Sequence, residues 1–222
     1  MKSKNLFGAL AVLLCASSAY AQSAGSFVVY GGGVQITPKV ESGDLTAPSL
    51  PGTKIDVKKA SQFVGGITYY WTDNLSIDLP IGLPFKHDVV GAGAIEGVGK
   101  LGTVKSLPIT LLAQYRFGEA ASSFRPFVGA GVTYGRFFSP KSTAVLSGLT
   151  GGTPSNPTLL SMKSRFGPTV EAGAAYNLTR DWSLSASITK TFIKTTGSLS
   201  TGQTIETTLD PIGIKLSVGY RF

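Results

Sequence analysis

The sequence predicts an all-β fold, an eight-stranded antiparallel β-barrel that crosses a membrane. Residues 211–222 alternate between apolar side chains and small, polar or cationic ones, and successive side chains of a strand point to opposite faces. The alternation lasts about eleven residues, the length that a tilted strand needs to cross a bilayer. Similar segments recur along a chain with 28 glycines, and only a closed barrel pairs every strand backbone in lipid.

The amino terminus has the parts of a secretory signal peptide. Residues 1–4 carry two lysines, residues 6–16 are apolar, and Ala19 and Ala21 are small residues at the positions that a signal peptidase reads. We predict that residues 1–21 are cleaved and that residues 22–222 form a single barrel domain. Cys15, the only cysteine, leaves with the signal, so we expect no disulfide and no metal site. No later stretch of about 18 apolar residues exists, which excludes a transmembrane helix.

The first four predicted strands cover residues 26–36, 59–71, 75–82 and 107–117. Pro38 ends the first strand, because proline cannot donate to a strand ladder. Residues 72–74 form a short turn of Thr, Asp and Asn between the second and third strands. In the fourth strand the odd-numbered positions are apolar.

The last four predicted strands cover residues 125–134, 162–178, a segment that begins at Trp182, and 211–222. The facing of residues 125–134 stays ambiguous, because both parities carry aromatic side chains. In residues 162–178 the alternation predicts that Val170 faces outward and Glu171 inward.

Long and short connections alternate between these strands. The long ones are residues 37–57, 83–106, 139–160 and 195–206. This is the layout of a bacterial outer-membrane barrel, with short periplasmic turns and long extracellular loops. Eight strands leave room for packed side chains or one slender ligand. Residues 83–106 contain Val89, Val90 and Ile95, which we expect to lie at the barrel mouth or among lipopolysaccharide acyl chains, out of bulk water.

The charge of the chain predicts a membrane partner. Of 20 basic residues, Lys2 and Lys4 leave with the signal, so the formal charge falls from +8 to +6. The other basic residues are dispersed and an exported chain meets little nucleic acid, so we expect no nucleic-acid partner. We expect the loops to lie near the phosphates of lipopolysaccharide in an anionic leaflet.

Aromatic residues cluster where the predicted strands reach the membrane interfaces. A barrel of this class carries aromatic girdles there. The aromatic carboxy-terminal residue also resembles the signal by which outer-membrane barrels are handed to their assembly machinery. We therefore predict that Phe222 is this assembly signal, and that the girdle comprises Tyr69, Trp71, Trp182, Tyr220 and Phe222.

Several predicted inward positions are apolar where a water-filled pore requires charges. They indicate a hydrophobic cargo, and the alternative is that they only fill a sealed barrel. They are Val28, Tyr30, Val34, Val64, Tyr70 and Leu112.

His87 is the only histidine, and it lies beside Asp88. A hydrolase needs a positioned nucleophile and an oriented base, and no nucleophile motif accompanies this histidine. We therefore predict that the protein is not an enzyme and that it has no cofactor.

Short motifs in order along the mature chain resemble the OmpW family of small outer-membrane barrels. They are residues 72–75 (TDNL), 83–87 (LPFKH), 107–117 (LPITLLAQYRF), 124–131 (FRPFVGAG), 180–182 (RDW) and 219–222 (GYRF). The resemblance implies an eight-stranded barrel with an apolar interior that passes small hydrophobic molecules. It also implies that the cargo leaves sideways, through a gap in the wall, into the membrane.

The resemblance assigns roles to individual positions. Pro108 matches a family proline near the outer end of the fourth strand, where a missing donor leaves a local opening. Leu107, Pro84 and Phe85 lie in the motifs beside it. Phe166 falls where the family has an aromatic side chain in the lumen. Pro80 replaces an apolar lumen residue of the family, so the narrowest point is expected to differ.

The expected hydrophobic gate of the lumen comprises Leu112, Phe166, Pro80, Tyr70 and Val64. Two functions remain open. The first is an outer-membrane channel for the passive passage of small hydrophobic molecules, with lateral release into the membrane. The second is a structural or surface-interaction barrel with a closed lumen.

Overall fold

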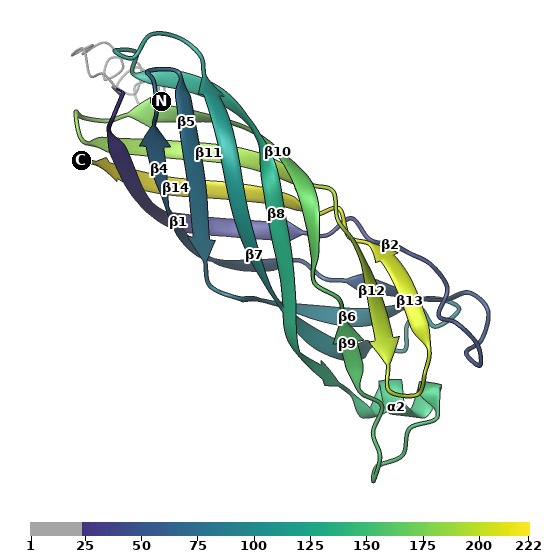
Figure 1. Cartoon of the computed structure of the whole chain (residues 1–222). Helices are drawn as coiled ribbons and strands as arrows, with labels where there is room; N and C mark the ends of the chain where they lie inside the picture. The colour runs from purple at the N-terminus through teal and green to yellow at the C-terminus, as the bar shows by residue number, and fades with distance from the viewer. Residues whose placement is uncertain (1–23) are drawn as a thin grey trace, which may run out of the picture.

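The computed structural model describes residues 24–222, so the predicted signal peptide and its cleavage site lie outside the described residues. Its strands close into an antiparallel barrel (Figure 1). Around the wall the order is β1-β4-β5-β7-β8-β10-β11-β14, and β14 pairs with β1. The predicted eight-stranded barrel is confirmed. The strands are β1 (Phe27–Thr37), β4 (Ala60–Tyr70), β5 (Leu75–Gly82), β7 (Lys100–Arg116), β8 (Phe124–Ser142), β10 (Arg165–Asn177), β11 (Trp182–Thr191) and β14 (Ile212–Arg221).

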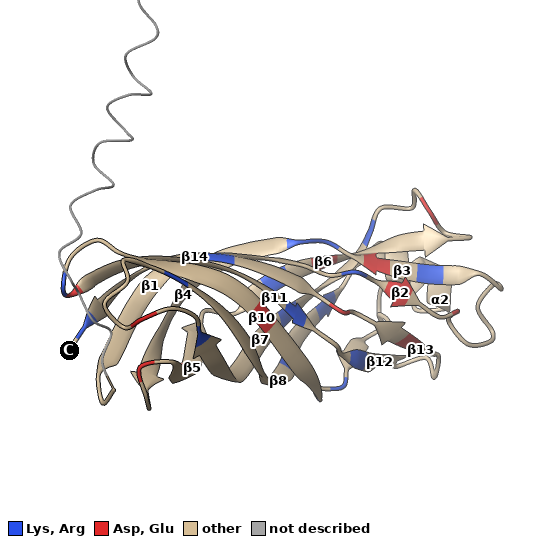
Figure 2. Cartoon of the chain, turned by 90° about the horizontal axis from the view of Figure 1, so that it is seen from above, with Lys and Arg blue, Asp and Glu red and all other residues tan. Residues whose placement is uncertain are grey.

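Each barrel strand turns one parity outward, as the alternation predicts. In β14, Ile214, Leu216 and Val218 are exposed, whereas Gly213 and Ser217 are buried. A band of exposed aliphatic and aromatic side chains would be unfavourable in water, and it matches the lipid-facing belt of a membrane barrel. Figure 2 shows long stretches of the barrel wall without charged residues. Within residues 24–222, no helix has the length and apolar character needed to span a bilayer.

The four long connections contain more regular structure than the sequence indicates. Residues 83–106 form a hairpin of β6 (Phe85–Gly93) with the first part of β7, and β3 (Thr53–Val57) pairs with β6. A separate four-stranded sheet has the order β2-β13-β12-β9. We call β2, β3, β6, β9, β12, β13 and α2 the head. Its remaining elements are β2 (Glu41–Ser42), β9 (Leu160–Met162), β12 (Lys194–Leu199), β13 (Thr204–Thr208) and α2 (Ala144–Thr150).

The head lies at one end of the barrel, and both termini of the described chain lie at the other (Figure 1). Aromatic rings gather at the end with the termini. The Tyr69 ring lies 4.7 Å from that of Phe27, and the Tyr220 ring lies 5.0 Å from those of Trp182 and Phe222. These residues share one level because Phe27 is in register with Tyr69, and Trp182 with Tyr220. An interfacial girdle at this end remains a prediction.

Candidate functional site

The inward side chains of β7 divide the lumen into two parts. From the head towards the termini they are Ser106, Pro108, Thr110, Leu112, Gln114 and Arg116. The positions as far as Leu112 face a mainly apolar cavity, whereas Gln114 and Arg116 belong to a polar cluster. The lumen therefore changes character part-way along the barrel.

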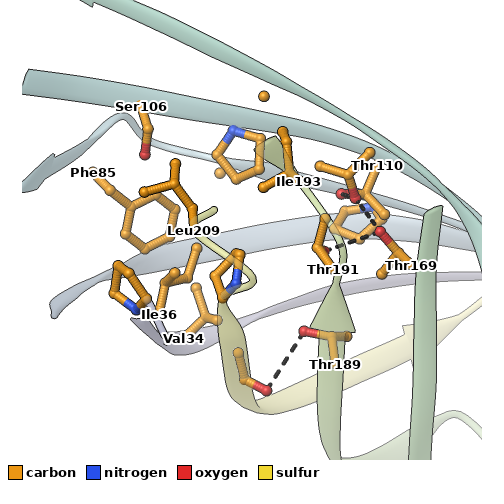
Figure 3. Close-up of a pocket in the computed structure, with 18 of the residues that line it drawn as sticks. Val34, Ile36, Phe85, Ser106, Thr110, Thr169, Thr189, Thr191, Ile193 and Leu209 are labelled. Carbon is orange, nitrogen blue, oxygen red and sulfur yellow. Dashed lines mark hydrogen bonds between the residues drawn. The ribbon is translucent and has the colours of Figure 1, made fainter. Parts of the chain in front are cut away.

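The apolar cavity contains about 1210 Å³ of empty space, part of which is open to the outside. Val34 and Ile36 of β1 approach it from one side, and Phe85, Ile193 and Leu209 approach it from the head (Figure 3). Val64 and Leu112, both buried, contribute to the wall. Aliphatic and aromatic linings of this kind favour an apolar ligand.

The part of the lumen nearer the termini is filled by a hydrogen-bonded ionic cluster. Asp78 accepts hydrogen bonds from the hydroxyls of Thr68 at 2.7 Å and Tyr30 at 3.2 Å. The Lys215 ammonium lies 3.5 Å from carboxylate oxygens of both Asp78 and Glu171. A hydrophobic molecule would have to displace or desolvate these groups to pass, which is costly. The cluster therefore forms a polar floor under the apolar cavity.

Arg116 extends this floor towards the end with the termini. Its guanidinium donates to Gln114 at 2.9 Å and to Ser76 at 3.2 Å. It also lies over the rings of Tyr70 and Phe127, at 4.9 and 4.7 Å from the centroids. Tyr70, predicted as part of the hydrophobic gate, thus belongs to the polar floor.

The wall is incomplete between β5 and β7. Their register runs from Leu75 with Tyr115 to Asp78 with Leu112 and stops there. Beyond that point β5 still pairs with β4, as far as Gly82, and β7 still pairs with β8. The next contact along this edge of β7 is with β6, where Phe85 is in register with Ser106. The ladder is therefore interrupted between residues 79–82 and 107–111, and we call this interruption the gap.

Two prolines explain why the pairing stops. Leu83 donates its N–H to β4 and Arg116 donates its N–H towards β5, at Asn74. Backbone N–H and C=O groups alternate between the two sides of an antiparallel strand. The N–H and C=O groups of the even-numbered residues of β5 therefore point towards β7, and those of the even-numbered residues of β7 point towards β5. Pro80 and Pro108 are such residues, and proline has no N–H to donate. Each edge of the gap thus lacks a ladder donor.

Five of the predicted gate and lateral-opening residues meet at the apolar cavity. Val64, Pro80, Leu112, Phe85 and Pro108 line the apolar cavity together. Pro84, next to Phe85, accepts a hydrogen bond from the Gln62 amide through its carbonyl, at 3.3 Å. Leu107 lies on the outer face, in register with Arg136 of β8.

The expectation that Phe166 lines the lumen is wrong. Its side chain is 72% exposed and packs on the Tyr134 ring, with centroids 4.6 Å apart. The physical reason is strand parity. Gly167 and Thr169 of β10 are buried and face inward, so Phe166 faces the lipid.

Sequence reasoning missed four threonines at the cavity wall, Thr110, Thr133, Thr169 and Thr191. Their inward parity was the available signal. Threonine is common in strands, however, and nothing in the linear pattern shows that four of them meet.

A second apolar cavity lies in the head and contains about 820 Å³ of empty space, part of which is open to the outside. A cluster of buried residues lines this cavity: Ile95, Leu101, Leu146 and Leu199. Val57 and Met162 line both cavities, so the two spaces adjoin. Val89 and Ile95 are buried here and Val90 is half-buried, as expected for residues kept out of bulk water.

His87 lies between the head and the lumen and is held by packing and hydrogen bonds. Nδ1 lies 2.8 Å from the Lys58 carbonyl oxygen and Nε2 lies 3.1 Å from the Ser106 hydroxyl. Burial lowers the pKa of this imidazole, against smaller opposing effects of the Lys58 carbonyl and the Asp88 carboxylate. Both ring nitrogens have hydrogen-bond partners, so a structural role is enough to account for this buried histidine.

Comparison with known proteins identifies the family. The model of the OmpW family matches residues 23–222. The chain belongs to the OmpW family. Outer membrane protein W of Escherichia coli (strain K12) is 35% identical over 219 residues, covering 96% of this chain and 97% of that protein. The OmpW-family resemblance and the bacterial outer-membrane location predicted from the sequence are confirmed.

Two other relatives are informative. The crystal structure of OprG from Pseudomonas aeruginosa superposes with a TM-score of 0.81 at 28% identity, covering 91% of this chain and 98% of that chain. The dibenzothiophene metabolism operon protein DoxH of Pseudomonas sp. (strain C18) is 26% identical over 181 residues, covering 80% of this chain and 79% of that protein. Like OprG, an outer membrane protein, this OmpW-family chain is an outer-membrane barrel in contact with membrane lipid.

Proposed function

We propose that this barrel is a passive conduit for small hydrophobic molecules across the outer membrane. The cargo enters the head, occupies the apolar cavity and leaves sideways between β5 and β7 into the lipid. No cofactor and no chemical step are involved. The driving force is the concentration gradient together with the favourable transfer of apolar surface into lipid.

The observation that carries this proposal is that the apolar cavity lies directly behind the gap in the wall. Pro80 and Gly82 on one edge and Pro108 and Thr110 on the other all line the cavity. A molecule there faces lipid on one side and the ionic floor of Asp78, Glu171 and Lys215 on another. Entering the floor would cost desolvation of charged groups, so the sideways route has the lower barrier.

A relative supports the class of cargo. The name of DoxH places it in an operon for dibenzothiophene metabolism, and dibenzothiophene is a small hydrophobic aromatic compound. A cavity lined by Val34, Ile36, Phe85 and Leu209 suits molecules of this kind through apolar burial alone.

We also propose lipopolysaccharide phosphates as a partner of the outer surface. Lys86 and Lys105 are exposed and lie directly opposite each other on β6 and β7, and Arg136 is exposed on the neighbouring β8. Among the ion pairs of residues 24–222, none involves these three cations. Like charges directly opposite each other are unfavourable, and a phosphate between them offsets the cost.

The carboxy-terminal strand supports the last predicted partner. In β14 the outward residues Ile214, Leu216 and Val218 are apolar, and the chain ends at the exposed Phe222. We propose that the barrel assembly machinery binds this strand before the barrel closes.

The deciding experiment compares the uptake of a small apolar fluorophore by cells that carry the wild-type barrel and by cells that carry Pro80→Ala/Pro108→Ala. The double variant restores two N–H donors at the gap, so β5 and β7 pair further and uptake slows. Pro168→Ala is the matched control, because Pro168 is an outward-facing proline of β10 remote from the gap. If wild-type cells and cells without the barrel take up the fluorophore equally, a closed surface-interaction barrel becomes the better account.

A further inference from the structure

We propose that the apolar cavity contains a binding subsite for one polar end group of its cargo, formed by a chain of threonine hydroxyls. The cargo class that this subsite favours is an aliphatic or aromatic molecule with a single hydroxyl or carbonyl group, such as a medium-chain alcohol. The inference rests on the proposed transport function and specifies its substrate.

Four threonines on four neighbouring strands form one hydrogen-bonded chain. Thr110 of β7 and Thr133 of β8 have their hydroxyl oxygens 2.8 Å apart. Thr133 and Thr169 of β10 are separated by 2.6 Å, and Thr169 and Thr191 of β11 by 3.0 Å. All four line the apolar cavity, and Figure 3 shows the part of the chain at Thr110, Thr169 and Thr191.

The number of protons in this chain leaves one for a ligand. Each hydroxyl has one donor hydrogen, so four hydroxyls carry four, and three bonds use three of them. Within residues 24–222, neither end hydroxyl, Thr110 or Thr191, makes another side-chain hydrogen bond. When all three bonds run in the same direction, one end offers a free O–H and the other a free acceptor. Reversing all the bonds exchanges the two ends, so either end suits a donor or an acceptor.

The Thr110 end lies where the cargo must pass. Thr110 is half-buried on the β7 edge of the gap, between Pro108 and Leu112 on the inward face. The β5 residue that would be opposite it is Pro80, beyond the last register pair. The Thr110 hydroxyl thus lies on the cavity wall beside the interrupted ladder, whereas Thr133 and Thr169 are buried.

The rest of the cavity gives this hydroxyl its selectivity. A polar end group that enters an apolar space loses its water, and that loss is costly unless a partner replaces it. The end of the threonine chain supplies the partner. An alkane leaves the three internal bonds intact, so it also passes, but it gains nothing from the subsite. The structure thus predicts a preference for the polar-ended molecule and not an absolute requirement.

The test measures the initial uptake of radiolabelled n-octane and 1-octanol by cells whose only barrel of this family is the variant under study. Thr110→Val removes the hydroxyl but keeps the branched shape. It should raise the half-saturating concentration of 1-octanol about three- to tenfold, the effect of one hydrogen bond, and leave that of n-octane unchanged. Thr110→Ser keeps a hydroxyl and should restore the wild-type value. Heat-modifiable mobility on gels verifies that each variant is folded.

Thr189→Val is the matched control. Thr189 lines the same cavity, but its hydroxyl donates to the Gly213 carbonyl and is not part of the chain. The subsite is refuted if Thr110→Val changes both compounds equally or neither, or if Thr189→Val has the same effect. If wild-type cells take up n-octane no faster than cells without the barrel, the proposed transport itself is wrong and the subsite is rejected with it.

Discussion

Asp78 and Leu112 form the last register pair between β5 and β7, and each residue is only 1% exposed. The two residues face the same lumen but belong to different environments. Asp78 is bound to Thr68, Tyr30 and Lys215 in the ionic floor, whereas Leu112 lines the apolar cavity.

The change in lumen polarity and the end of wall pairing therefore coincide at one pair of residues. On one side of this pair the wall is closed and the lumen is ionic. On the other side the β5–β7 ladder is interrupted and the lumen is apolar. Under the proposed function, the ionic floor blocks hydrophobic molecules at this level and the interrupted ladder gives them a sideways exit into lipid.

Replacing Leu112 by Asp should reduce the uptake of a small apolar compound about fivefold or more. The new carboxylate would lie in the apolar cavity at its boundary with Asp78, and burying a polar group without a partner costs about 1–3 kcal/mol or more, where about 1.4 kcal/mol is tenfold. Initial uptake rates per folded barrel test this. Phe166→Ala is the control, because Phe166 faces lipid. Equal losses in both variants would indicate a general effect on the barrel.

The misplacement of Phe166 shows what could be predicted and what could not. Alternation predicted the eight barrel strands because each strand carries its own two-residue period. The same period places Val170 outward, and it places Phe166 outward as well. The family resemblance suggested a lumen position and parity contradicted it, and the local physical rule was correct.

Features that depend on two distant segments were beyond prediction. Pro108 alone suggested an opening, but only the folded register shows that Pro80 faces the same edge. Likewise, residues 194–208, rich in threonine, have the composition of a loop and yet form the hairpin of β12 and β13. A strand with polar side chains on both faces has no clear alternation, so its partners decide its structure.

Replacing Lys215 by Met should destabilise the barrel by about 3–5 kcal/mol, since it leaves the buried carboxylates of Asp78 and Glu171 without their cation. Unfolding by guanidinium in lipid vesicles measures the change. Lys54→Met is the control. The Lys54 side chain is exposed and its ammonium lies 3.9 Å from the Asp44 carboxylate, so its loss should cost about 1 kcal/mol or less. Similar costs for the two variants would show that the floor is not a coupled ionic cluster.

The double variant Lys86→Gln/Lys105→Gln should bind vesicles containing phosphorylated lipid A more weakly than wild type, and the difference should shrink at high salt. Binding to dephosphorylated lipid A should not change. Lys54→Gln/Lys58→Gln removes the same charge from lysines that already pair with Asp44 and Asp56. If this control loses as much binding, net charge and not the Lys86 and Lys105 pair attracts the lipid.

The lowered pKa of His87 predicts that the protein loses stability on mild acidification. In the unfolded chain the imidazole has a pKa near the ordinary 6.5, and burial in the folded protein lowers it. Between these two values the unfolded state binds the proton and the folded state does not, so stability falls as the pH falls. The stability that depends on a neutral His87 is complete above about pH 6.5. It decreases as the pH falls from there to the pKa of the imidazole in the folded protein.

Thermal unfolding at pH 7.5 and 5.5 measures this effect. The wild type should lose more stability over the interval than His87→Gln, which has no titratable side chain at this position. The carboxylate of the adjacent Asp88 is present in both proteins, so the difference between them isolates the imidazole. Equal losses in the two proteins would mean that water or a rearrangement around Lys58 and Ser106 accommodates the charged ring, and that the contacts of His87 do not couple the head to pH.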